Sequence, residues 1–260
     1  MLLNLYVYTT EIASDQIPSD NPIHQRLLQA YYEAEPFIEG DLLELGCGEG
    51  RGVEILTDRA TSYLGLDKIE EVISNLKEKH PNHQFEASVF PPLKLPDNSF
   101  DTVVSFQVIE HIKHDAEYLS EIHRILKPGG KAILSTPNIK MTLSRNPWHE
   151  REYTADELST LASNYFFKVD MRGIAGSEKV MEYHERNRQS VQRIMKYDVL
   201  DLQYKLPASV LRLPYDLLNR MNRNKLQKQA DDLVLSITRN DYYLAEKSET
   251  NLDLFCILYK

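Results

Sequence analysis

The sequence LLELGCGEG, Leu42 to Gly50, decides the fold of this 260-residue chain. Four mostly apolar residues lead into a turn that carries Gly46, Gly48 and Gly50. An apolar run that ends in closely spaced glycines predicts a buried strand that breaks sharply into a helix. Glycine suits such a turn because the backbone takes unusual dihedrals there and a ligand can approach without meeting a Cβ. The stretch therefore predicts a nucleotide-type site after the first strand of an α/β sheet, with backbone amides facing the ligand.

Two ligand classes compete for a glycine turn of this kind. The dinucleotide fingerprint Gly-x-Gly-x-x-Gly, counted from Gly46, needs a third glycine where Arg51 stands. The pattern is instead Glu-x-Gly-x-Gly-x-Gly, from Glu44 to Gly50, and it resembles the first motif of the class I S-adenosylmethionine (SAM) dependent methyltransferases. A glycine turn without a ligand is the structural alternative, so further landmarks along the chain are needed.

Composition limits the class of protein. The hydrophobic content of 42% is enough for a sizeable core, no run approaches a membrane span, and the N-terminus lacks the pattern of a signal peptide. Neither cysteine, Cys47 or Cys256, has a metal-like or redox-like neighbour, so we expect a reduced, cytoplasmic setting. The net charge of −9 argues against nucleic-acid binding. We expect a monomer or homodimer without stable membrane insertion, and peripheral membrane contact stays open.

An acidic residue ends the second predicted strand, about 20 residues past the glycines. The apolar run from Tyr63 to Leu66 leads directly to Asp67. A carboxylate at this place can accept hydrogen bonds from both hydroxyls of an adenosine ribose. Capping of the helix predicted over Ile69 to Lys79 is the alternative. Position and spacing together favour ribose binding.

The resemblance to the methyltransferases extends over four landmarks from Leu42 to Asn138. After strands predicted over 84–89 and 100–106 come the loop QVIEH, 107–111, and the segment LKPGG-x-x-x-x-STPN. The family usually has an aspartate that reads adenine at the end of the third strand, where this chain has Ser88. The resemblance implies SAM as cofactor, with the methionine portion at 44–50, the ribose at Asp67 and the adenine at Ser88 and Val89. The full set of implied cofactor-binding residues is Glu44, Gly46, Cys47, Gly48, Gly50, Asp67, Lys68, Ser88, Val89, Gln107 and Val108.

Two histidines are candidates for catalysis. In an open α/β sheet the carboxyl ends of the strands line the ligand crevice, so the topology puts His111 near the chemistry. His149 lies in NPWHEREYT, 146–154, which resembles a Pro-x-His-x-x-Glu-Tyr-Thr segment of bacterial family members. We predict His111 or His149 as general base. The same loop supplies the predicted substrate-binding residues Trp148, Glu150 and Tyr153, although a helix-entry loop with an inward-packed tryptophan also fits. No metal-ligand spacing is evident, so we predict no metal.

The segment 177–247 departs from the family pattern. The family joins its last two strands by a short hairpin, but here this mostly helical segment separates strands predicted over 166–172 and 252–259. It carries 13 Lys and Arg against 10 Asp and Glu, and within 205–228 six basic residues face only Asp216. Such a basic amphipathic stretch suits an anionic substrate or a membrane surface, and packing onto the core is the alternative. We predict a substrate lid over 177–247 on a SAM-binding core formed by 1–176 and 248–260.

Together these features predict an α/β fold with a Rossmann-like, seven-stranded methyltransferase sheet, six strands parallel and the last antiparallel. The predicted function is SAM-dependent methyl transfer to oxygen or nitrogen of a small-molecule, sugar or glycan, or lipid-linked acceptor. The alternative is a catalytically silent SAM-binding protein that regulates a partner.

Overall fold

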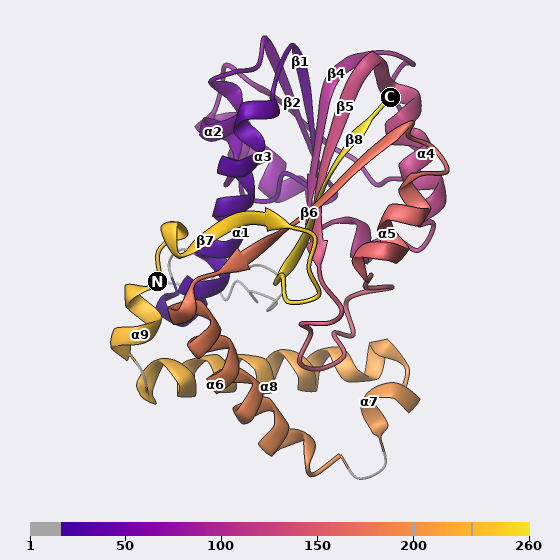
Figure 1. Cartoon of the computed structure of the whole chain (residues 1–260). Helices are drawn as coiled ribbons and strands as arrows, with labels where there is room; N and C mark the ends of the chain where they lie inside the picture. Colours follow the sequence, from indigo (N-terminus) through magenta and orange to yellow (C-terminus); the bar gives the residue numbers. More distant parts are fainter. Residues whose placement is uncertain (1–16, 199–200, 230) are drawn as a thin grey trace. The chain divides into compact units, whose positions relative to one another are not determined.

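A computed structural model describes residues 17–198, 201–229 and 231–260 (Figure 1). They form two compact units. The sheet unit comprises 27–142, 149–175 and 243–260, and the helical unit comprises, among the described residues, 17–26, 143–148 and 176–242. The first 16 residues of the predicted core lie outside the described part of the chain.

Within the described residues the sheet has eight strands, in the order β3-β2-β1-β4-β5-β8-β6-β7. Strands β1 to β5 pair in parallel, and β8 runs antiparallel to both of its neighbours, β5 and β6. This arrangement confirms the predicted Rossmann-like α/β fold. The strands are β1 (Asp41–Leu45), β2 (Ser62–Asp67), β3 (Gln84–Ala87), β4 (Phe100–Phe106), β5 (Leu126–Pro137), β6 (Lys168–Gly176), β7 (Tyr242–Glu246) and β8 (Asp253–Tyr259).

The sheet contains one strand more than the seven predicted. The extra strand, β7, lies at the edge beside β6 and within the segment predicted as a mostly helical insertion. Its five residues, YYLAE, include one buried residue, Tyr242. A strand this short at a sheet edge depends on its neighbour for pairing, and local periodicity alone does not reveal it.

Helices cover both faces of the sheet in the sheet unit. Figure 1 shows α2 and α3 on one side and α4 and α5 on the other. Apolar side chains of α4 and α5 pack with those of β4, β5 and β8 in one buried core. Helix α5 begins at a capping box in which Thr154 and Glu157 satisfy each other's backbone N–H groups. The helices are α1 (Asn21–Ala34), α2 (Val53–Thr57), α3 (Glu70–Lys79), α4 (Asp115–Ile125) and α5 (Ala155–Ala162).

The helical unit is assembled from segments far apart in the sequence. Its helices are α6 (Glu178–Met195), α7 (Leu202–Lys205), α8 (Ala208–Gln229) and α9 (Asp231–Ser236). The buried carboxylate of Asp20 pairs with the guanidinium groups of Arg220, at 2.7 Å, and Arg223, at 3.0 Å. The backbone N–H of Ser177 donates to the carbonyl of Asp241 at 2.8 Å, so the two ends of the segment 177–241 lie side by side.

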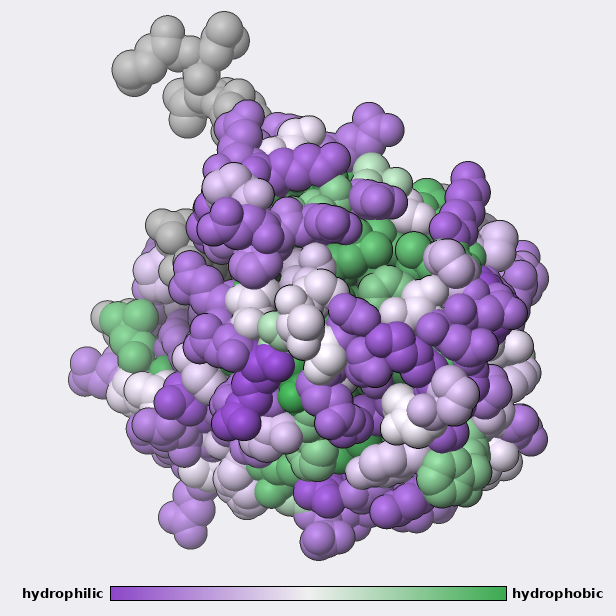
Figure 2. All heavy atoms as spheres, turned by 90° about the horizontal axis from the view of Figure 1, so that it is seen from above, coloured by the Kyte–Doolittle hydropathy of each residue, from purple (hydrophilic) through white to green (hydrophobic). Residues whose placement is uncertain are grey.

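One face of the molecule is largely hydrophilic. On the face that Figure 2 shows, hydrophilic residues cover most of the area and hydrophobic ones appear in smaller areas between them. The mean hydropathy of −0.44 agrees with this view. Among the described residues, no helix combines the length and the apolar character that crossing a bilayer requires.

Candidate active site

The glycine turn after β1 has the backbone that the sequence predicts. Gly46, Gly48 and Gly50 all have positive φ, at +76°, +49° and +79°. A Cβ on Gly46 would lie 2.4 Å from Val108 Cγ2, whereas a Cβ on Gly48 would meet no atom within 4 Å. Glycine at position 46 is therefore required by both conformation and packing, and the space beside Gly48 is open.

Glu44 is a buried carboxylate held by two tyrosines. Its side chain accepts hydrogen bonds from the hydroxyls of Tyr31, at 2.8 Å, and Tyr63, at 2.5 Å. Burial nevertheless dominates and raises the pKa of Glu44 to about 7, because the charged form is poorly solvated. The residue that opens the motif is thus fixed in place directly before the glycine turn.

Asp67 links the glycine turn to the start of α3. One carboxylate oxygen accepts from the backbone N–H of Gly48 and the other from that of Ile69, each at 3.0 Å. Ile69 is the N-cap residue of α3. The side chain of Asp67 therefore contacts both the start of α3 and the glycine turn. Each carboxylate oxygen can accept a further hydrogen bond, so ribose binding stays a prediction.

The other predicted cofactor residues differ in accessibility. Lys68 and Val89 are exposed, and the N–H of Ser88 donates to the carbonyl of Asp67 at 2.8 Å. Cys47 is buried, and burial raises the pKa of its thiol far above the ordinary value, so it stays protonated. Gln107 has a left-handed φ of +55°, which starts the turn that follows β4.

The glycine turn and the segment 107–111 follow neighbouring strands. Strands β1 and β4 pair in parallel with Leu45 opposite Ser105, so the glycine turn and residues 107–111 begin at adjacent carboxyl ends. The close approach of Gly46 to Val108 brings the two segments into contact. This edge of the sheet is where ligands bind in open α/β folds.

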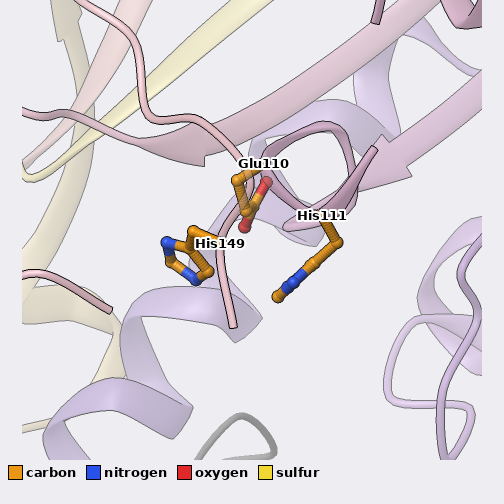
Figure 3. A group of neighbouring side chains, drawn as sticks. All are labelled: Glu110, His111 and His149. Atoms are coloured by element: carbon orange, nitrogen blue, oxygen red, sulfur yellow. The ribbon is translucent and has the colours of Figure 1, made fainter. Parts of the chain in front are cut away.

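Glu110, His111 and His149 meet beside these strand ends. Figure 3 shows their side chains converging, and one nitrogen or oxygen atom of each lies within 4.8 Å of those of the other two. The rings of His111 and His149 meet edge to face with centroids 4.9 Å apart. The structure thus brings both predicted catalytic histidines together and adds a carboxylate.

Two members of this cluster, Glu110 and His149, are held by surrounding groups. Thr136 donates to Glu110 Oε2 at 2.8 Å, and Glu152 Oε1 lies 2.7 Å from His149 Nδ1. Glu110 is buried, which raises the pKa of its carboxyl group to about 7; the nearby His149 acts in the opposite direction, and the charge of Asp253 adds to the rise. The cluster is therefore anchored on one side by Thr136 and on the other by Glu152.

The predicted substrate residues differ in their surroundings. Trp148 belongs to the helical unit, where its Nε1 donates to Asp216 at 3.2 Å and Arg212 covers its ring at 4.3 Å. Tyr153 is buried, and its hydroxyl donates to Asp115 at 2.8 Å. Glu150 is exposed.

Sequence reasoning missed the two residues that hold the cluster, Glu152 and Thr136. Glu152 lies three residues after His149, a spacing that could have suggested the pairing. Thr136 lies on β5, 26 residues from Glu110, and only the strand pairing brings the two together.

Comparisons with known proteins agree with this geometry. Residues 43–134 match the family described as the methyltransferase domain. A relative from Mycolicibacterium smegmatis, named a probable S-adenosylmethionine-dependent methyltransferase, is 38% identical over 158 residues, which cover 58% of this chain and 61% of the relative. A phthiotriol/phenolphthiotriol dimycocerosates methyltransferase from Mycobacterium leprae is 26% identical over 167 residues, 62% of this chain and 61% of that protein. The chain thus spans less than two thirds of the length of these relatives.

Among solved structures, a SAM-dependent methyltransferase from Thermotoga maritima, described as a possible histamine N-methyltransferase, has a TM-score of 0.59. The match covers 92% of this chain and 91% of that one at 15% identity, and it therefore supports the fold alone. The glycine turn, Asp67 at the end of β2 and the matched domain lead to one conclusion. Residues 43–134 form a methyltransferase domain similar to that of proteins named as SAM-dependent methyltransferases.

Proposed function

We propose that this protein transfers the methyl group of SAM to a hydroxyl oxygen of a glycan, a lipid-linked molecule or a smaller metabolite, activated by the cluster of Glu110, His111 and His149. The single observation that carries the proposal is the adjacency of the glycine turn and the cluster, at the carboxyl ends of the paired strands β1 and β4. The glycine turn suits the methyl donor, and the cluster suits the acceptor.

The donor side rests on Glu44 to Gly50 and Asp67. Methyl transfer is largely proximity catalysis, because the sulfonium of SAM already carries the reactive methyl group. A rigid turn that fixes the cofactor contributes most to such a reaction. The hydrogen bonds from Gly48 and Ile69 to Asp67 provide that rigidity.

The acceptor side favours oxygen over nitrogen. A neutral amine attacks the methyl group unaided, whereas a hydroxyl has to lose its proton. Two imidazoles and a buried carboxylate in one cluster suit that second case. In the reaction the acceptor oxygen forms the new O–C bond while the C–S bond breaks, and sulfur keeps the electron pair.

A cavity in the helical unit favours an acceptor with a hydrocarbon portion. Its volume is about 530 Å³, and apolar side chains such as Ile194, Leu211 and Leu218 contribute to its lining. Pockets of about 300–1,000 Å³ hold drug-sized apolar ligands. Pro147 also lines this cavity, and the chain continues from it through Trp148 directly to His149. We therefore propose that the helical unit is a substrate lid and that a lipid-linked acceptor is the first class to test.

The test uses the full chain, methyl-labelled SAM and three acceptor pools: a lipid extract, a glycan fraction and a set of small hydroxyl compounds. We expect label in the lipid fraction. His111→Ala or His149→Ala should reduce turnover by about 100-fold or more while SAM binding is kept. His114→Ala, at an exposed histidine of the same segment, is the matched control.

Failure to label any pool, with SAM binding intact, would favour the alternative of a catalytically silent SAM-binding regulator. Label on an amine with full activity of both histidine variants would instead refute the role of the cluster.

A further inference from the structure

Glu110, His111 and His149 have the composition and the spacing of a metal-ligand set. The candidate ligand atoms lie within 4.8 Å of one another (Figure 3). Divalent transition metals hold nitrogen and oxygen ligands at about 2.0–2.2 Å, so neighbouring ligand atoms of a tetrahedral ion are about 3.4 Å apart. Side-chain rotations that move each of these atoms by less than about 1 Å would bring all three to one ion.

Two of the three side chains are oriented by outer hydrogen bonds, as metal ligands usually are. Glu152 Oε1 lies 2.7 Å from Nδ1 of His149 and orients its ring. Thr136 donates to Oε2 of Glu110 at 2.8 Å and orients its carboxylate. Glu152 also accepts a hydrogen bond from Thr142, so the carboxylate behind His149 is itself held.

The backbone ties the two ligand-bearing segments together. The carbonyl of Glu110 accepts from the N–H groups of Glu150, at 2.7 Å, and Arg151, at 3.2 Å. His149 therefore cannot move far from Glu110 and His111, although 38 residues separate it from His111. A preorganised set of this kind needs little reorganisation to bind an ion.

We propose that Glu110, His111 and His149 bind a divalent first-row transition-metal ion. Two imidazoles with one carboxylate favour ions such as manganese, iron, cobalt or zinc, whereas calcium and magnesium prefer sets made entirely of oxygen. Three protein ligands leave further positions on such an ion for exchangeable ligands.

The consequence for chemistry rests on the proposed function. An ion held by Glu110, His111 and His149 would supply a Lewis acid, which would make the hydroxyl of an acceptor beside it easier to deprotonate. In this arrangement the histidines act as ligands, and no imidazole has to take up the proton.

The experiment measures metal binding directly, without SAM or acceptor. The full chain, purified without a histidine tag and stripped with a chelator, is titrated with Co²⁺ and followed by visible absorption, and with Mn²⁺ followed by electron paramagnetic resonance. We expect saturation at one ion per chain. His111→Ala and His149→Ala should each weaken binding at least about tenfold, and Glu152→Gln should weaken it about 10–100-fold. His114→Ala should bind as the unsubstituted protein does.

Absence of saturable binding, or equal affinity in the His111, His149 and His114 variants, would overturn the proposal. Because Glu110 is buried, Glu110→Gln is interpreted only if circular dichroism shows a folded protein. If it does not fold, the two histidine variants are the test of the proposal. A protein that binds no metal yet transfers methyl groups keeps the proposed function and loses this inference. A protein that binds metal but not SAM keeps this inference and loses the proposed function.

Discussion

Glu44→Gln tests whether burial makes the ionised carboxylate of Glu44 unfavourable in the folded protein. Burial raises the pKa of Glu44 from 4.5 to about 7. Between these two values the folded state binds more protons than the unfolded state, so the free energy of unfolding falls as pH rises. A shift of this size corresponds to about 3 kcal/mol, lost between about pH 4.5 and pH 8. Glutamine has nearly the same shape and no charge, so the variant should not suffer this loss.

The assay compares urea unfolding of the two proteins at pH 5 and pH 8, followed by circular dichroism. We expect similar stability at pH 5 and a variant that is more stable by about 2–3 kcal/mol at pH 8. The amide can donate to one tyrosine oxygen and accept from the other hydroxyl, so the contacts with Tyr31 and Tyr63 can be kept. Glu86→Gln, at an exposed residue of β3, controls for the loss of a charge. A difference between variant and parent that is the same at both pH values would refute the reasoning.

The same residue links stability to cofactor binding. If the ammonium group of SAM lies beside Glu44, binding should favour the ionised carboxylate and release a proton near pH 6. Calorimetry in two buffers of different ionisation enthalpy measures that proton. Proton release by the parent and not by Glu44→Gln is the expected result, and equal release by both would place the ammonium elsewhere.

Three further perturbations address the predicted cofactor site and the proposed lid. Asp67→Ala removes the acceptor for Gly48 and Ile69 as well as the predicted ribose contact, so affinity for S-adenosylhomocysteine should fall about 10–100-fold by calorimetry; unchanged affinity in a folded variant would refute the assignment. Gly46→Ala puts a Cβ 2.4 Å from Val108 Cγ2 at a positive φ, and it should lower the free energy of unfolding by about 1–3 kcal/mol, measured in urea; a neutral effect would contradict the packing argument. Replacing 178–240 by a short glycine-containing turn should leave a protein that binds SAM without turnover, because the flanking residues Ser177 and Asp241 are already hydrogen bonded; full activity would show that this segment is no lid.

The strands that bear the cofactor site could be predicted because each is a short apolar run that ends in a polar or glycine signal. The fourth strand was predicted over Phe100 to Phe106 and has these bounds, and Asp67 ends β2 as expected. These elements are set by local sequence together with burial on both faces, which a parallel sheet imposes. Strand β7 was not predicted because its pairing partner, β6, lies more than 60 residues away in the chain.

The histidine cluster could be predicted only in part. Topology puts His111 at the end of β4, but the path of the loop from 138 to 149 decides which side chain meets it. The assembly of the helical unit was equally inaccessible, because the pairing of Asp20 with Arg220 and Arg223 joins residues about 200 positions apart. Both depend on contacts between distant segments, and no periodic pattern records them.

The position of β8 between β5 and β6 has a consequence for synthesis on the ribosome. When residues 126–176 emerge, β5 has an open edge and β6 has no strand to join, because their common neighbour is encoded at 253–259. The whole of 177–252 must be made before β8 can fill that edge. Until then the nascent chain presents an unpaired apolar strand, the kind of surface on which other chains aggregate. The time needed to translate 177–252 therefore sets the shortest period for which the sheet stays vulnerable, and slow folding of this segment would lengthen it.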